Sequence, residues 1–164
     1  MRKLLPLFIL TAALGCDVGA GKYTVIRLAV ADSSLSDSCY FMNMPDPDVV
    51  DDDINVRAGS TIAIFPSDKE SFWLEWGPVS IPGSKDGSAF SFAATDTDLT
   101  VVGDSRRTEV TEHDVTMELK GGAVDGTYTN TYTCSGEGCP ISSCVTTTTF
   151  VGAVVRDVDV THEL

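Results

Sequence analysis

The sequence predicts an all-β protein, an antiparallel meander that closes into a small barrel of about eight strands. Apolar and polar residues alternate with a period of two in several short segments, and pairs of Gly, Pro and Asp separate these segments. Beyond the apolar N-terminal run, no segment shows the periodicity of an amphipathic helix. A β-sandwich is the alternative, because it too is built from short antiparallel strands.

The strands follow from this pattern in chain order. Early strands are expected at 22–30, 54–57, 61–65, 72–76, 89–94, 99–102 and 107–111. The clearest element is a β-hairpin, in which 115–119 and 127–134 alternate on either side of a turn at Gly121-Gly122. The segment 144–155, CVTTTTFVGAVV, is rich in β-branched residues and predicts a last strand. Turns are expected at Pro82-Gly83, Asp86-Gly87, Gly103-Asp104 and Asp125-Gly126.

The expected layout is that of a small lipocalin-like barrel, and the likeness is limited to layout. A lipocalin carries Gly-x-Trp on an early strand, whereas this chain has Trp76-Gly77 in the opposite order. The layout therefore carries no functional implication.

Residues 1–15 have the features of an export signal. Arg2 and Lys3 form a basic start, and the apolar run that follows is too short to cross a bilayer as a helix. The segment Ala13-Leu14-Gly15-Cys16 resembles the lipobox of bacterial lipoproteins, with small Gly15 just before the cysteine. This resemblance implies that residues 1–15 are removed, that Cys16 carries an acyl lipid, and that 16–21 form a short tether for a single domain over 22–164. An ordinary signal peptide is the alternative.

Charge excludes one class of partner. The formal net charge is −13, and loss of 1–15 removes Arg2 and Lys3 but no acid, which leaves 24 acidic against 9 basic residues, a net charge of −15. Such a surface repels nucleic acid, so a nucleic-acid partner is not expected.

The cysteines support an oxidising compartment. The chain has five, and lipidation of Cys16 leaves an even set for two disulfides: Cys39, Cys134, Cys139 and Cys144. The preferred pairing is Cys134 with Cys144 and Cys39 with Cys139. The next choice is Cys139 with Cys144 and Cys39 with Cys134.

The segment PDPDVVDDD concentrates carboxylates of the kind that bind Ca²⁺, at Asp46, Asp48, Asp51, Asp52 and Asp53. No glycine provides the tight wrap of a calcium loop, so a solvated acidic loop is the preferred interpretation. No other cofactor is expected.

The best binding candidate lies in the segment SFWLEWGP. In a strand, Phe72, Leu74 and Trp76 share one face, and Trp73 and Glu75 share the other. If the first three line the interior, Trp73 stands beside Glu75 on a polar face. An indole in that place is suited to stack on a sugar or to contact a protein, although coverage by a loop is the alternative.

Catalytic residues are few. Of the two histidines, His113 is expected to be exposed at the start of a strand, pointing away from neighbouring Glu112 and Asp114. Gly103-Asp104-Ser105 resembles the start of a G-D-S hydrolase block, but it lies mid-chain in an expected hairpin turn and is followed by Arg106. The sequence therefore indicates a noncatalytic protein, and a secreted hydrolase is the least favoured alternative.

The sequence thus predicts a cell-envelope lipoprotein whose β-domain serves as a binding or scaffold module. Its partners would be the bilayer, through the acyl anchor, and an envelope protein, a glycan or a small ligand. A carrier of a small apolar ligand is the alternative. Asn130, between Tyr128 and Tyr132, would then line the ligand cavity, or it would simply hydrogen-bond a buried tyrosine. Asp17 resembles the inner-membrane retention signal of enteric bacteria, so the inner membrane is favoured over the outer, with secretion as the alternative.

Overall fold

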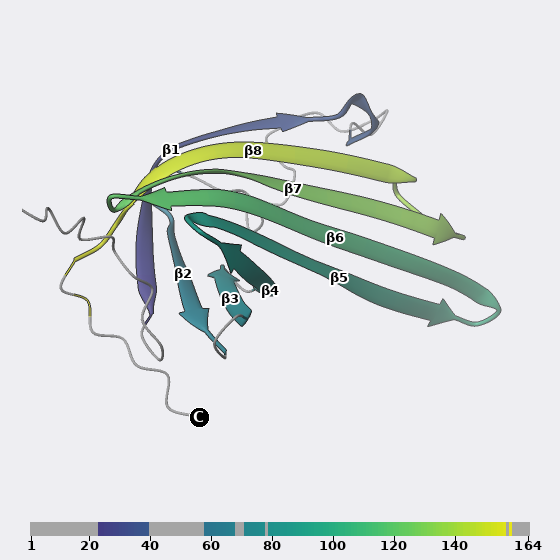
Figure 1. Cartoon of the computed structure of the whole chain (residues 1–164). Coiled ribbons are helices and arrows are strands. Elements are labelled where there is room, and N and C mark those ends of the chain that lie inside the picture. The colour runs from purple at the N-terminus through teal and green to yellow at the C-terminus, as the bar shows by residue number, and fades with distance from the viewer. Residues whose placement is uncertain (1–22, 40–57, 68–70, 78, 157, 159–164) are drawn as a thin grey trace, which may run out of the picture.

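The computed structural model describes residues 23–39, 58–67, 71–77, 79–156 and 158. Its strands are β1 (Thr24–Leu35), β2 (Thr61–Pro66), β3 (Ser71–Trp76), β4 (Val79–Asp86), β5 (Ala89–Val102), β6 (Ser105–Lys120), β7 (Ala123–Gly136) and β8 (Ser143–Val154), with a 3-10 helix η1 (Asp37–Cys39) after β1. Each strand pairs antiparallel with the next, and β8 pairs with β1 to close the barrel (Figure 1). The predicted meander and barrel are confirmed, and the β-sandwich alternative is wrong. Among the described residues, no helix has the length and apolar character needed to span a membrane.

Three of the predicted turns are confirmed as tight links between strands. Gly87, Gly103 and Gly121 have φ angles of 60°, 62° and 62°, in the left-handed region that glycine adopts without a steric penalty. These turns join β4 to β5, β5 to β6 and β6 to β7. Strands β4, β5 and β6 are therefore each followed at once by their antiparallel neighbour.

Two other predicted turns are wrong, because Pro82-Gly83 lies inside β4, which was not expected as a strand, and Asp125-Gly126 lies inside β7. A Cβ atom on Gly83 would lie 2.3 Å from Cδ1 of Phe92, and one on Gly126 would lie 2.5 Å from Cζ of Phe150. These glycines therefore make room for aromatic rings of the core instead of turning the chain.

Several predicted strands are parts of longer ones. Residues 89–94 and 99–102 both belong to β5, and residues 107–111 and 115–119 both belong to β6. The polar residues between them stay paired across the two strands. In β5, alternation fades at 95–98 because both faces of the sheet are exposed there. In β6, the inward residue of the intervening stretch is the polar His113, which interrupts the apolar pattern. The strand expected at 54–57 lies outside the described residues.

The interior of the barrel is filled by apolar side chains from all eight strands. Aromatic rings meet at its centre, where the Trp76 ring lies 5.0 Å from that of Tyr128 and 5.1 Å from that of Phe150. The buried cluster consists of Ile26, Leu28, Ile62, Ile64, Phe72, Leu74, Trp76, Ile81, Phe90, Phe92, Val115, Met117, Leu119, Val124, Tyr128 and Phe150. Burial of this apolar surface is the main force that holds the barrel closed.

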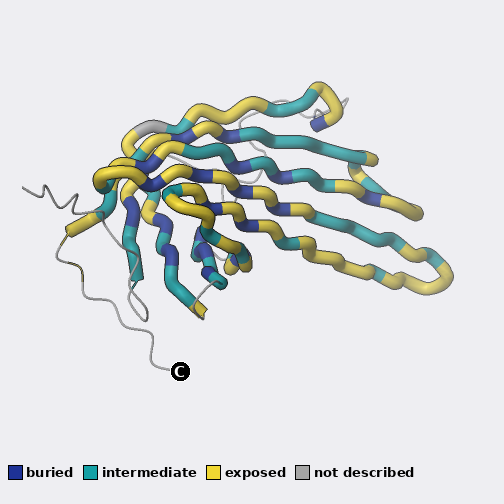
Figure 2. The backbone as a smooth tube through the Cα atoms, viewed as in Figure 1, coloured by how far each residue is buried: buried dark blue, intermediate teal, exposed yellow. Residues whose placement is uncertain are grey.

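Part of the sheet continues beyond the barrel. Strands β2, β3 and β4 are short, whereas β5 to β8 and β1 run on together as a curved sheet (Figure 1). We call this continuation the extended half, and it comprises 29–39, 93–114 and 129–149. Buried residues become fewer toward the tip of the β5–β6 hairpin (Figure 2). The extended half therefore has an inner face that no second layer of described strands covers.

Candidate functional site

Trp73 lies on the outer face of the barrel, where strand alternation directs it. Its neighbours Phe72, Leu74 and Trp76 are buried in the interior, and Trp73 itself is half-buried. Across the sheet, Trp73 pairs with Phe65 on β2 and with Pro82 on β4. The indole is therefore flanked on both sides by flat apolar groups.

A fourth residue extends this surface. The ring of Tyr23, just before β1, lies 4.8 Å from the ring of Phe65 with an interplanar angle of 37°. Tyr23, Phe65, Trp73 and Pro82 thus form a line across four neighbouring strands, which we call the aromatic row. Of these four residues, the sequence pattern predicts only Trp73, because the other three become its neighbours through the pairing register of β1 to β4.

Polar groups lie on both sides of the aromatic row. Glu75 is two residues from Trp73 on the same face. The pKa of Tyr23 is raised chiefly by burial, and further by the charge of Glu75 and by a hydrogen bond to it. On the other side, Ser71 pairs with Ser84. This arrangement combines rings that can stack with a carboxylate and hydroxyls that can hydrogen-bond.

On the inner face, a polar cluster marks the end of the apolar core. His113 is buried, with 4% of its surface exposed, so the expectation of an exposed strand-end histidine is wrong. Because β6 begins well before it, His113 shares the inward face with Val115 and Met117. It does point away from Glu112 and Asp114, as expected, but it meets Asp96 of β5, whose Oδ2 lies 3.3 Å from its Nε2.

The remaining groups of this cluster satisfy one another. The Nε2 atom of His113 lies beside Asp96, and its Nδ1 shares a hydrogen bond of 2.7 Å with the Tyr128 hydroxyl. Asn130 Nδ2 lies 3.2 Å from both His113 Nδ1 and the Tyr128 oxygen. Burial raises the pKa of Tyr128, as does the charge of Asp96, while the bond to Asn130 opposes the rise. Asn130 therefore bonds a buried tyrosine, and the buried Tyr128 hydroxyl is not placed to attack a substrate.

A second inner cluster lies further along the same strands. Tyr132 donates to Glu109 at 2.6 Å, and Glu109 also pairs with Arg107 at 3.0 Å. Burial, the hydrogen bond to Glu109 and its charge raise the pKa of Tyr132 to about 12, against the opposing charge of Arg107. Arg107 also donates to the carbonyl of Gly138 at 3.3 Å. These contacts fix the inner face of β6 and β7 near the tip.

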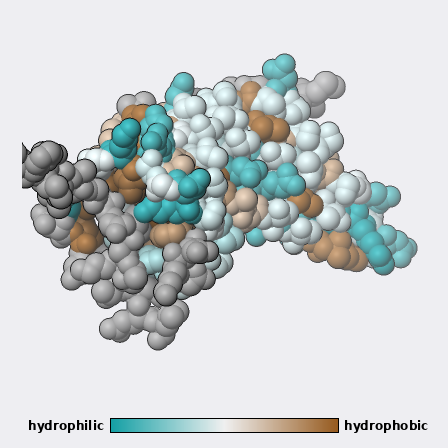
Figure 3. Space-filling view, viewed as in Figure 1, coloured by the Kyte–Doolittle hydropathy of each residue, from teal (hydrophilic) through white to brown (hydrophobic). Residues whose placement is uncertain are grey.

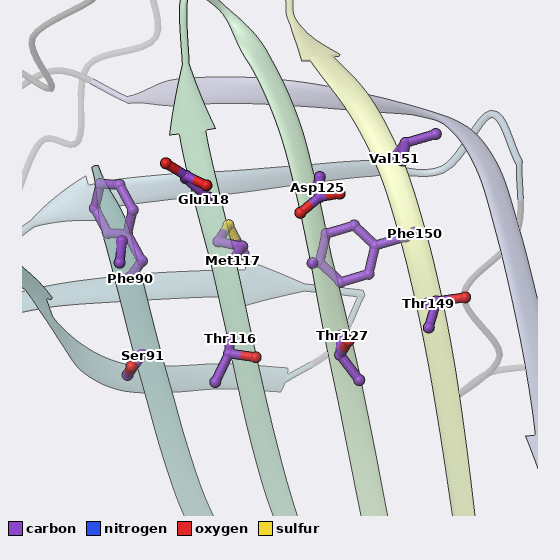
Figure 4. A pocket seen from close by; sticks show the side chains of 12 residues that line it. Phe90, Ser91, Thr116, Met117, Glu118, Asp125, Thr127, Thr149, Phe150 and Val151 are labelled. Atoms are coloured by element: carbon purple, nitrogen blue, oxygen red, sulfur yellow. The ribbon is translucent and has the colours of Figure 1, made fainter.

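A groove of about 470 Å³ opens on the outer face of β5 to β8 (Figure 4). One row of hydroxyl residues crosses it, made of Ser91, Thr116, Thr127 and Thr149. Glu118 and Asp125 stand opposite each other at one end, and Glu118 accepts a hydrogen bond from Ser88 at 2.9 Å. The groove offers hydrogen-bonding groups, but no histidine or cysteine lines it, so it lacks a nucleophile with an adjacent base.

The four cysteines expected to pair do so, but both favoured pairings are wrong. Cys39 pairs with Cys144, and Cys134 pairs with Cys139. The reason is the closure of the barrel: β1 pairs with β8 up to Leu35 opposite Thr146, which brings η1 and Cys39 beside the start of β8. Cys134, at the end of β7, then meets Cys139 in the loop that follows.

The other predicted site residues lie outside the described part of the chain. These are the lipidation residue Cys16 and the acidic residues Asp46, Asp48, Asp51, Asp52 and Asp53. Within the described ranges, no three His, Cys, Asp or Glu side chains are grouped so as to hold a metal ion. The calcium site stays a prediction, as does the lipid anchor.

Comparison with known proteins adds no further assignment. No known protein family, no curated protein and no solved structure matches this chain.

Proposed function

We propose that this protein is a noncatalytic lipoprotein of the bacterial cell envelope that binds a neutral glycan along the aromatic row. Cys16 would hold it to a bilayer through an acyl lipid, with the inner membrane favoured. The barrel would present the aromatic row, with Glu75 beside it, to the glycan. The observation that carries this proposal is the outward line of Tyr23, Phe65, Trp73 and Pro82.

The lipid anchor is supported by the cysteines. The two disulfides use Cys39, Cys134, Cys139 and Cys144, which leaves Cys16 as the remaining member of the five. A free thiol is uncommon in an exported protein, whereas a lipobox cysteine has an acyl chain as its partner.

Binding at the outer surface is supported by the filled interior. Apolar side chains from all eight strands occupy the barrel, and Gly83 and Gly126 leave room only for the rings of Phe92 and Phe150. A carrier would need space at that place for its ligand. Nothing in the described interior favours the carrier alternative.

The chemistry of the aromatic row favours a sugar. A pyranose has apolar C–H faces that pack on aromatic rings, and hydroxyls at its rim that need hydrogen-bonding partners. Trp73 and Phe65 supply rings, and Glu75 supplies an acceptor. The net charge of −13 repels acidic polysaccharides, so we favour a neutral glycan.

Titration with a neutral N-acetylglucosamine hexamer tests this binding, with tryptophan fluorescence and calorimetry as readouts. The protein would carry Cys16→Ser so that it remains in solution. We expect Trp73→Ala to weaken binding by about tenfold or more, because it removes the central ring. Val151→Ala, at a residue 42% exposed on the outer face of β8, is the matched control and should bind like the parent. Equal binding by the Trp73→Ala protein would refute a glycan site at the aromatic row.

The anchor has its own test. Mass spectrometry of the mature N-terminus should detect an acylated Cys16, and a Cys16→Ala protein should leave the membrane fraction. An unmodified N-terminal residue, or a Cys16→Ala protein that stays with the membrane, would contradict the lipid anchor without affecting the glycan proposal. A density gradient that separates the two membranes tests the preference for the inner one.

A further inference from the structure

We propose that the outer edge of β5 is a docking site for an extended segment of another protein, which adds to the sheet as an antiparallel strand. The segment would alternate apolar or β-branched residues with lysine or arginine. This interaction lies in the extended half and is independent of the proposed glycan site.

The first observation is that β5 loses its neighbour partway along its length. Its pairing with β4 runs from Ala89 to Phe92, while its pairing with β6 continues to Val102. Among the described residues, no strand pairs with β5 from Ala93 onward on that side. The extended half therefore ends in an open edge about ten residues long.

Pro82 explains where the β4 pairing stops. The next pair of the β4–β5 register after Gly83 and Phe92 would join Pro82 to Ala93. Proline has no N–H to donate, so this pair cannot close its hydrogen bonds. The open edge thus begins at a residue that cannot continue the ladder.

The hydrogen-bond pattern shows which groups face the edge. Leu119 N donates to Ser88 O at 2.9 Å, so Ser88 and Leu119 form a bonded pair of the β5–β6 ladder. Hydrogen-bonded pairs recur at every second residue in an antiparallel ladder, so the even-numbered residues of β5 are the ones whose N–H and C=O groups bond to β6. The odd-numbered residues direct N–H and C=O to the open edge; these are Ala93, Thr95, Thr97, Leu99 and Val101.

The side chains along this edge are exposed, and they differ between the two faces. On the outer face, Leu99 and Val101 are 60% and 55% exposed, and apolar surface appears near the hairpin tip (Figure 3). On the inner face stand Asp96 and Asp98, both exposed. The stretch has no lysine, proline or bulge to protect its edge, and its inner-face aspartates repel a pairing strand only where that strand does not neutralise them.

These features select the occupant. The open N–H and C=O groups require a strand, Leu99 and Val101 favour apolar residues on its outer face, and the two aspartates favour basic residues on its inner face. A second copy of this chain fits poorly, because it would place its own aspartates beside these and each copy has a net charge of −13.

The probe is an acetylated and amidated eight-residue peptide of alternating valine and lysine, added to the full chain with Cys16→Ser at physiological salt. In antiparallel pairing its valines lie opposite the odd-numbered residues of β5, so the valine N–H groups donate to the edge and the lysine N–H groups point away. A peptide N-methylated at valine should lose binding, and one N-methylated at lysine should keep it. Equal binding by the unmodified peptide and by both N-methylated peptides would show that charge attraction alone accounts for binding, and it would overturn the proposal.

Substitutions in β5 complete the test. Thr97→Pro removes one edge-facing N–H and leaves the β6 bonds intact, and we expect about tenfold weaker peptide binding. Thr97→Val keeps that N–H and should bind within about twofold of the parent. Asp98→Lys should weaken binding of the valine–lysine peptide and strengthen binding of a peptide of alternating valine and glutamate. Unchanged binding by Thr97→Pro would overturn the proposal.

Amide exchange measured by NMR separates the other occupants. In the free protein, the amides of Thr95, Thr97, Leu99 and Val101 should exchange quickly, and the peptide should protect them. Protection in the free monomer would show that a segment of this chain already covers the edge. Protection that appears only with dimer formation would identify a second copy. Either result would overturn the proposed partner.

Discussion

The two halves of this sheet share strands but are held together differently. In the barrel, inward residues such as Phe92, Val115 and Phe150 meet side chains from the opposite wall. In the extended half, the same strands direct His113, Asn130 and Tyr132 inward, and no opposite wall of described strands faces them. Strand pairing thus continues without an apolar core, provided that other links replace it. Here those links are two disulfides and the polar clusters around His113 and Tyr132.

The largest effect is expected from the disulfide that ties β1 to β8. Cys39 and Cys144 are 105 residues apart, whereas Cys134 and Cys139 are 5 apart. In the chain-entropy treatment, loss of the first costs about 4 to 5 kcal/mol of unfolding free energy and loss of the second about 2 kcal/mol. Urea unfolding of Cys39→Ala/Cys144→Ala and of Cys134→Ala/Cys139→Ala under non-reducing conditions measures both. Equal losses would contradict the view that the long link is the main covalent support of the extended half.

A cavity in the barrel should come next. Leu74 is completely buried, and Leu74→Ala should lower the unfolding free energy by about 3 kcal/mol. The matched change in the extended half is Val102→Ala, at a residue that is 71% exposed. This change should alter the unfolding free energy by less than about 0.5 kcal/mol. Thermal or urea unfolding compares the two. Similar losses would mean that the hairpin tip has an apolar contact in the folded protein.

Replacing the Tyr128 hydroxyl tests the boundary between the halves. Tyr128→Phe leaves the ring in the core but deprives His113 Nδ1 of its closest partner, at 2.7 Å. We expect a loss of about 1 to 2 kcal/mol in unfolding free energy, the usual cost of a buried polar group left with fewer bonds. Thr133→Ala, on the exposed face of the same strand, is the control. No loss from Tyr128→Phe would show that the cluster contributes nothing to joining the halves.

Local patterns predicted most of the barrel. Alternation in 115–119 and 127–134 identified β6 and β7, and the glycine turns at 103 and 121 fixed how neighbouring strands follow each other. These signals succeed because period-two alternation and a positive φ depend on residues close in sequence. The same local rule placed Trp73 on the outer face.

What the sequence missed depends on contacts between distant segments. The disulfide pairing requires that β1 close on β8, and alternation within either strand contains no such information. Phe65 and Pro82 join Trp73 only through the register of β2, β3 and β4. Gly83 and Gly126 have the signature of turns but serve the packing of rings from other strands. His113 was misplaced because the strand that holds it continues into a polar stretch.

The smallest effect concerns Tyr132 in the extended half, and its dependence on pH appears only at high pH. In the folded protein its pKa is raised to about 12, whereas an unfolded tyrosine ionises near pH 10. The unfolded state therefore loses its proton first, so this contribution to stability is complete below pH 10 and is lost as the pH rises toward about 12. Tyr132→Phe removes the hydrogen bond to Glu109, so it should lower stability near pH 7 by less than about 1 kcal/mol. It should also make the decline between pH 10 and 12 shallower. In a titration at 295 nm, the variant should lack absorbance that the parent gains near pH 12. If the absorbance missing from the variant lies near pH 10 instead, the bond to Glu109 and the burial of this ring do not hold the Tyr132 proton, and the inner face near the tip is open to solvent.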